Sequence, residues 1–194
     1  MRVLLIALAA LIAAMLLVWL HGSNARRIDA TYHAGLAKTL LITSSSIPAD
    51  GEIPPSFTCQ GTGVSPELDW KSGPANAQSY AVVMTDFDVP APYFALASFT
   101  HWIVYNIPAG QRQVQAAFTP SAPGQSVISV GENSTGVHGY QPPCPPLGTH
   151  RYAIRVYALD VARLKPPSDD AAAVLDSMRG HIIAYGALVG RVKH

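Results

Sequence analysis

Three clusters of residues suited to binding a charged ligand lie where an apolar run meets a turn. The first contains Asp86 and Asp88, which follow a run with the pattern of a buried strand. The second contains His101 at the start of the next strong apolar run, and the third contains His150, which follows a loop with four prolines in residues 142–146. An Asp-x-Asp pair in an extended chain directs both carboxylates to the same face. Both aspartates are therefore expected at one site.

Carboxylates beside imidazoles suit an anion that lies near an ammonium group. A histidine near a carboxylate is expected to keep its proton to a higher pH, and an imidazolium donates a charge-assisted hydrogen bond to a phosphoryl oxygen. Each cluster alone is more often explained by a turn, a structural histidine or a shaped loop, whereas together they meet the needs of a polar pocket. The predicted pocket is built around Asp86, His101 and His150, with Asp88, Pro90, Cys144 and Tyr152 lining or supporting it.

Short apolar runs separated by turn residues predict a mostly β domain. The run Arg151–Leu159 alternates, so that Tyr152, Ile154, Val156 and Ala158 share one face of a strand. The 16 prolines and 15 glycines favour a turn-rich β fold over a helical bundle. Other strands are expected over residues 40–43, 80–85, 101–107 and 126–130.

One helix is expected near the C-terminus. Residues 166–168, Pro-Pro-Ser, supply a stop and then an N-cap. Val174, Leu175 and Met178 form one apolar face, and Gly180 is placed to end the helix.

Composition bounds the function classes. Hydrophobic residues make up 49% of the 194 residues and charged residues 13%, which suits one well-buried domain. The formal net charge is +1 with no basic stripe, so nucleic acid is not an expected partner.

The N-terminus contains an unbroken apolar run from Val3 to Leu20. Eighteen apolar residues span most of a bilayer core as a helix and exceed a usual signal-peptide core. A membrane anchor is favoured on length, and a signal peptide cleaved after Ala25 is the alternative. Either directs the domain to a periplasmic or other extracytoplasmic location. The expected division is residues 1–25 as signal peptide or anchor, 26–37 as linker and 38–194 as the ligand-binding domain.

The sequence contains two cysteines, Cys59 and Cys144, in no metal-like C-x-x-C spacing. An even number of cysteines in an exported protein indicates a disulfide.

These motifs, in their order along the chain, resemble those of the phosphatidylethanolamine-binding protein family, in its bacterial YbhB/YbcL-like branch. Residues 86–90 resemble the family's D-P-D-A-P motif, and His101-Trp102 resembles its downstream histidine and aromatic. Residues 139–152 resemble its second signature, and the likeness runs from about residue 41 to residue 192. Phe87 and Val89 depart from the first motif. Pro142 replaces a glycine and removes a backbone N–H from the loop.

The resemblance implies a two-sheet β-sandwich-like fold with a large antiparallel sheet, a smaller sheet, and a helix in the C-terminal region. It implies a pocket at one end of the sandwich for a phosphate-type anion or a phospholipid head group, with no required cofactor or metal. It also places the loops of Cys59 and Cys144 near one end.

The leading hypothesis is binding without catalysis, with modulation of a partner protein. An extracytoplasmic enzyme inhibitor is a second hypothesis. A metal-dependent hydrolase is a third, because two histidines and two aspartates suit a divalent metal, although no H-x-H or H-E-x-x-H spacing is present.

Overall fold

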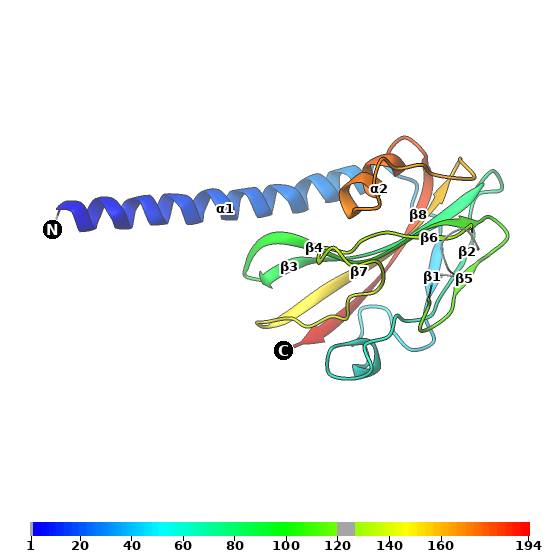
Figure 1. Cartoon of the computed structure of the whole chain (residues 1–194), viewed down its shortest axis with the longest axis horizontal. Helices are drawn as coiled ribbons and strands as arrows, with labels where there is room; N and C mark the ends of the chain where they lie inside the picture. The colour runs from blue at the N-terminus through cyan, green and yellow to red at the C-terminus, as the bar shows by residue number, and fades with distance from the viewer. Residues whose placement is uncertain (1, 120–126) are drawn as a thin grey trace.

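The computed structural model, which describes residues 2–119 and 127–194, contains two antiparallel sheets and thereby confirms the predicted fold class (Figure 1). The large sheet has the order β6-β4-β3-β7-β8, with β3 Ser79–Ala91, β4 Phe94–Pro108, β6 Ser129–Val130, β7 Thr149–Leu159 and β8 Ile182–Lys193. The small sheet has the order β1-β2-β5, with β1 Leu41–Thr43, β2 Leu68–Lys71 and β5 Gln113–Val114. A 3-10 turn, η1, covers Pro55–Phe57. Ser126, the expected start of the strand that became β6, lies outside the described residues.

The large sheet is buried on both faces, because a different layer packs on each. The predicted alternation of β7 is confirmed. Tyr152, Ile154 and Val156 point into the core shared with the small sheet, whereas Tyr157 and Leu159 point into a second core on the opposite face. The helix α2, Ala171–Met178, covers that second face with Val174 and Met178.

The α2 helix begins two residues later than the Ser168 N-cap predicts. Its N-cap is Asp170, whose side chain accepts a hydrogen bond from the backbone N–H of Ala173 at 2.9 Å. Two acceptors suited to an N-cap stand close together in this sequence, and the carboxylate gains more at a helix N-terminus than the hydroxyl does.

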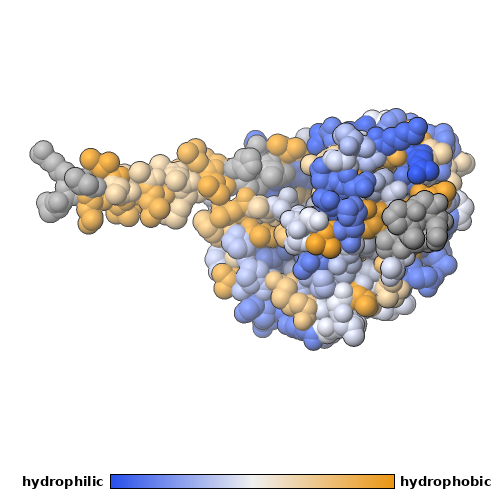
Figure 2. Space-filling view, viewed as in Figure 1, coloured by the Kyte–Doolittle hydropathy of each residue, from blue (hydrophilic) through white to orange (hydrophobic). Residues whose placement is uncertain are grey.

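The N-terminal helix α1, Arg2–Ala34, projects from the domain, and its exposed apolar side chains extend from Leu4 to Leu20 (Figures 1 and 2). Residues 26–34, within the expected linker, are the last turns of α1 and lie against the large sheet. In the part of the chain that the structure describes, no helix has the combined length and apolarity needed to cross a membrane.

Candidate functional site

The pairing of β3 with β4 contains one extra residue beside Asp86. Asp86 pairs with Phe99, and the next pair is Val89 with Ala97, so three steps along β3 match two along β4. Such a β-bulge changes which way the following side chains point. The Asp88 side chain therefore lies on a different side of β3 from the Asp86 side chain. The expectation that both carboxylates share one face is wrong.

A second irregularity places His101. Met84 pairs with Trp102 and Thr85 pairs with Thr100, so His101 stands between two paired positions as an extra residue of β4. Bulges in neighbouring strands thus lie directly at Asp86 and His101, where β-bulges commonly re-aim side chains of a site.

Five of the predicted site residues line one cavity of about 320 Å³. They come from three adjacent strands and the proline-rich loop: Asp86, His101, Cys144, His150 and Tyr152. This volume lies at the small end of the range for ligand sites, roughly 300–1,000 Å³. A cavity of this volume suits a small ligand rather than an extended molecule.

Asp86 and His150 form a buried pair. His150 Nδ1 lies 2.7 Å from Asp86 Oδ2, and Asp86 Oδ1 accepts the backbone N–H of Asp88 at 2.7 Å. His150 Nε2 lies 3.2 Å from the carbonyl oxygens of both Pro90 and Leu147, so that nitrogen carries a hydrogen. Both ring nitrogens of His150 are therefore used within the protein.

His101 has one ring nitrogen left for a ligand. Its Nδ1 lies 2.7 Å from the carbonyl oxygen of Gln141 and therefore donates to it. Its Nε2 has no hydrogen-bond partner within residues 2–119 and 127–194. Burial lowers the pKa of His101, against the opposing effects of the Gln141 hydrogen bond and the Asp86 charge. The expectation that the nearby carboxylate holds its proton to higher pH is wrong for this residue, because desolvation outweighs it.

Tyr152 places an unused hydroxyl beside His101. The two rings meet edge to face with their centroids 5.1 Å apart. The Tyr152 hydroxyl is buried and makes no hydrogen bond of normal geometry among the described residues, although it lies close enough to interact with the Asp86 carboxylate. Burial first, and then the Asp86 charge, raises the pKa of this hydroxyl, so it remains a donor. A buried hydroxyl without a well-formed hydrogen bond is costly, so this group is available to a molecule in the cavity.

Asp88 and Pro90 support the cavity from outside it. The Asp88 carboxylate accepts from the Arg151 side chain at 3.0 and 3.1 Å and from Arg26 of α1 at 3.2 Å. Burial would raise the Asp88 pKa, but these bonds and charges lower it overall. Pro90 contributes only the carbonyl oxygen that faces His150.

Comparison with known proteins places the chain in a family. The family described as phosphatidylethanolamine-binding protein matches residues 43–193. The chain belongs to the phosphatidylethanolamine-binding protein family. This is a family of ligand-binding proteins, and the predicted resemblance, including its YbhB/YbcL-like branch, is confirmed.

Several relatives share most of the family domain. A UPF0098 protein of Methanothermobacter thermautotrophicus is 37% identical over 140 residues, which cover 72% of this chain and 89% of that protein. A UPF0098 protein of Aquifex aeolicus is 37% identical over 155 residues, covering 78% and 87%. The crystal structure of CT736, a family homologue from Chlamydia trachomatis, matches with a TM-score of 0.71 and 33% identity over 81% of this chain and 99% of that chain. Escherichia coli YbcL matches with a TM-score of 0.71 and 25% identity over 80% and 99%.

The proline-rich loop that lines the cavity is tied down by a disulfide. Cys59 and Cys144 are bonded, with Cα atoms 5.4 Å apart. Pro142 packs over Gly63, where a Cβ atom would lie 2.8 Å from Pro142 Cγ, so the absent side chain makes room for this proline.

Other lining residues were not predicted from the sequence. They are Val89, Phe99, Thr135, Gln141, Pro142, Pro145 and Pro146. Most belong to the same proline-rich loop, and that loop was the only signal for them. Thr135 and Phe99 carry no motif of their own.

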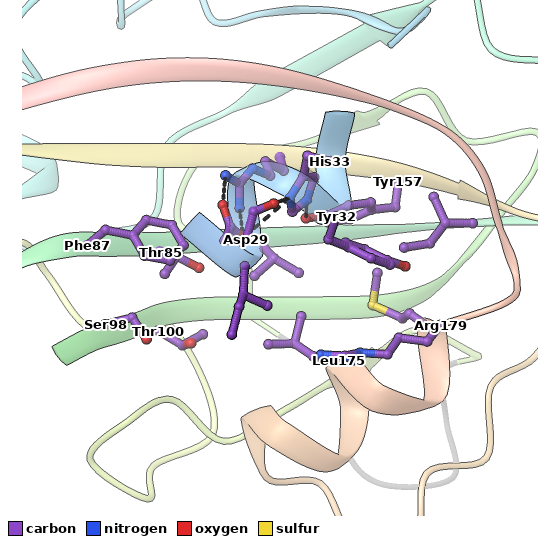
Figure 3. A pocket seen from close by; sticks show the side chains of 15 residues that line it. Asp29, Tyr32, His33, Thr85, Phe87, Ser98, Thr100, Tyr157, Leu175 and Arg179 are labelled. Atoms are coloured by element: carbon purple, nitrogen blue, oxygen red, sulfur yellow. Dashed lines mark hydrogen bonds and ion pairs between the residues drawn. The ribbon is translucent and has the colours of Figure 1, made fainter. Parts of the chain in front are cut away.

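A second cavity, also of about 320 Å³, lies on the opposite face of the large sheet, between α1 and α2 (Figure 3). Asp29 of α1 binds Arg155 through two hydrogen bonds of 2.7 and 3.0 Å, and His33 Nε2 lies 2.8 Å from the Tyr157 hydroxyl. None of the predicted site residues lines it. These contacts fix the end of α1 to the sheet.

Over the described residues, no group of three or more His, Cys, Asp or Glu side chains is arranged to hold a metal ion.

Proposed function

We propose that this family member binds a phosphate-type anion, free or as a phospholipid head group, in the cavity of Asp86, His101 and Tyr152. The observation that carries the proposal is that two donors that make no well-formed hydrogen bond among the described residues face one small cavity. These are His101 Nε2, once protonated, and the buried Tyr152 hydroxyl. A phosphoryl oxygen accepts from both kinds of group.

Charge balance explains how such an anion is held. The Asp86 carboxylate already pairs with His150 at 2.7 Å, and this pairing reduces its repulsion of an anion in the cavity. Because His101 Nδ1 donates to Gln141, the neutral ring presents a lone pair to the ligand. Protonation of His101 converts that lone pair into a charged donor. Binding of the anion is therefore coupled to uptake of a proton.

Binding is proposed to occur without turnover. A histidine paired with a carboxylate acts as a general base only if its other nitrogen faces a reacting group. The second nitrogen of His150 instead faces the carbonyl oxygens of Pro90 and Leu147. His150 therefore holds the pocket in shape, and the proposal assigns the protein a ligand-dependent effect on a partner protein.

The proposed location is extracytoplasmic, at a membrane. Disulfides persist in oxidising compartments, and this chain has the bond between Cys59 and Cys144. The exposed apolar part of α1 is proposed as the segment that associates with the membrane.

The test is a calorimetric titration of the full chain, in nonionic detergent, with glycerophosphoethanolamine. We expect His101→Gln to weaken binding about tenfold to a hundredfold, since a hydrogen bond to a charged group contributes about 1.5–3 kcal/mol. The matched control is His181→Gln, because His181 lies in a partly exposed pair with Asp160 outside the cavity. Equal affinity in wild type and His101→Gln would overturn the proposal.

A further inference from the structure

The apolar part of α1 and the tip of the β3–β4 hairpin extend in the same direction. Three contacts give the direction of α1: His33 contacts Tyr157, Asp29 contacts Arg155, and Arg26 Nε donates to the Phe87 carbonyl at 2.7 Å. Tyr157 and Arg155 pair with residues 81 and 83 of β3. Moving back along α1 from residue 33 to residue 26 therefore moves forward along β3 from residue 81 to residue 87, toward the hairpin turn.

The hairpin tip lies level with the apolar segment of α1. The turn at residues 92–93 is about 17–20 Å beyond Phe87 at about 3.3 Å per strand residue. Figure 1 shows the hairpin extending alongside α1 toward the N-terminus, with most of α1 projecting beyond the hairpin. The tip therefore lies beside the end of the apolar segment of residues 4–20 that is nearest the domain.

That tip is itself apolar and exposed. Tyr93 is 77% exposed and Phe94 36%, and Leu147 of the neighbouring loop is 52% exposed. A Cβ atom at Gly148 would lie 3.4 Å from Pro92 Cδ, so the loop packs against the hairpin. Exposed aromatic side chains beside an apolar helix are typical of a membrane–water interface.

The tip is joined directly to the proposed ligand site. His150 Nε2 faces both the Pro90 carbonyl of the hairpin and the Leu147 carbonyl of the loop, each at 3.2 Å. The same ring holds Asp86 in the cavity wall. The tip and the cavity are therefore only a few residues apart, so a tip that lies at a membrane surface places the cavity near that surface.

Exposed cations lie at the same end of the large sheet. Arg151 pairs with Arg191 and Thr149 pairs with Lys193 across β7 and β8. Arg151 already binds Asp88, whereas Arg191 and Lys193 have no ion pair among the residues that the structure describes. Basic side chains next to an apolar surface attract the phosphates of lipid head groups.

We propose that the tip formed by Tyr93, Phe94 and Leu147 inserts into the head-group layer of the membrane that holds the apolar segment of α1. The cavity then receives its phosphate-type ligand from a lipid of that same leaflet rather than from free solute. The identity of the ligand and the membrane association of α1 rest on the proposed function, whereas the depth of the tip is measured separately from ligand binding.

The first test measures the depth of the tip in vesicles of phosphatidylcholine containing phosphatidylglycerol and phosphatidylethanolamine. The full chain carries a polarity-sensitive fluorophore at Tyr93→Cys, or, as the matched control, at Leu41→Cys on the small sheet, where Leu41 is 60% exposed. We expect the label at residue 93 to shift to shorter wavelength and to be quenched by nitroxide-labelled lipid, unlike the label at residue 41. Equal, solvent-like emission and equal quenching at both positions would overturn the proposal.

The second test separates the lipid source from the free ligand. Tyr93→Ser combined with Phe94→Ser leaves the cavity lining intact. We expect this variant to lose at least about threefold in crosslinking to a photoreactive phospholipid in vesicles, while its affinity for free glycerophosphoethanolamine stays within about twofold of wild type. Unchanged crosslinking would overturn the proposal. A wild type that shows a quenched tip but binds no free glycerophosphoethanolamine would refute the proposed function and leave the membrane contact standing.

Discussion

At the scale of single residues, the two histidines predicted for one site have different roles. Both precede or open an apolar run, and the sequence offers no reason to separate them. In the structure, His150 uses both ring nitrogens within the protein, whereas His101 uses only the one that faces Gln141. The difference depends on backbone carbonyls from distant loops. Such neighbours cannot be identified from residue types and spacing.

A substitution at Tyr152 tests whether the cavity is a binding site or a structural cluster. Tyr152→Phe removes a buried hydroxyl that makes no hydrogen bond of normal geometry in the described part of the chain. We expect the free energy of unfolding of the free protein to stay the same or to rise, by up to about 1–3 kcal/mol. Affinity for glycerophosphoethanolamine should fall by about twofold to tenfold, the contribution of one hydrogen bond.

Urea unfolding and calorimetry on the same preparation would check both effects. A large loss of stability with unchanged affinity would show that the hydroxyl serves the core and not a ligand.

At the scale of elements, regular patterns were predictable and interruptions were not. The alternation in β7 correctly predicts which side chains share its inner face. The shared face expected for Asp86 and Asp88 fails, because alternation assumes an unbroken strand and β3 contains a bulge between them. A bulge depends on the partner strand, which a single run of sequence does not specify.

Sequence patterns likewise did not predict that the C-terminal end of α1 packs against the large sheet. Residues 26–37 are mostly polar or small, which is typical of a linker, yet Arg26, Asp29 and His33 each contact residues of the sheet. These partners lie at least 60 residues further along the chain.

We predict that Asp29→Asn loosens α1 from the domain. The substitution leaves the largely buried Arg155 guanidinium without its carboxylate partner, 2.7 Å away. The expected cost is about 1–3 kcal/mol, seen as faster amide hydrogen exchange in residues 28–34.

Asp176→Asn is the matched control, since its pair with Arg179 spans 3.5 Å and is exposed on both sides. That control should cost no more than about 0.5 kcal/mol. Equal exchange in the two variants would mean that the Asp29–Arg155 pair does not hold the helix.

The hydrogen bonds of Glu67, in the connection between β1 and β2, predict that part of the protein's stability is lost in acid. Glu67 accepts hydrogen bonds from Ser45 Oγ at 2.7 Å, Ser44 Oγ at 2.9 Å and the Ser46 N–H at 2.9 Å. Burial would raise the pKa of Glu67, but these bonds lower it to about 2. The stabilisation is therefore complete above the ordinary glutamate pKa near 4.3 and is lost as the pH falls toward about 2.

Glu67→Gln should lower the free energy of unfolding at pH 7 by about 1–3 kcal/mol, and the difference from wild type should shrink as the pH approaches 2. Glu52→Gln, at an exposed position, is the control. Urea titrations across this pH range provide the measurement. A difference that is constant with pH would contradict the assignment.

At the scale of the whole molecule, the ordered motifs predicted the fold class, the family and the convergence of the cavity residues. Composition and periodicity alone indicated only a turn-rich β domain. The strand order, the layer formed by α2 on the second face, and the position of α1 beside the hairpin arise from contacts between distant segments. The disulfide joins two such segments, 85 residues apart, and one of its cysteines lines the cavity.

The central claim is that His101 takes up a proton when the anion binds. Calorimetric titration of the full chain with glycerophosphoethanolamine at pH 7, in two buffers of different ionisation enthalpy, measures that proton directly. The ligand keeps its own charge near this pH, and the pKa of free His101 is lowered, so His101 starts mostly neutral. The account predicts an uptake approaching one proton per ligand bound in wild type and in His181→Gln, and none in His101→Gln. Binding of the same affinity with no proton uptake in wild type would contradict it.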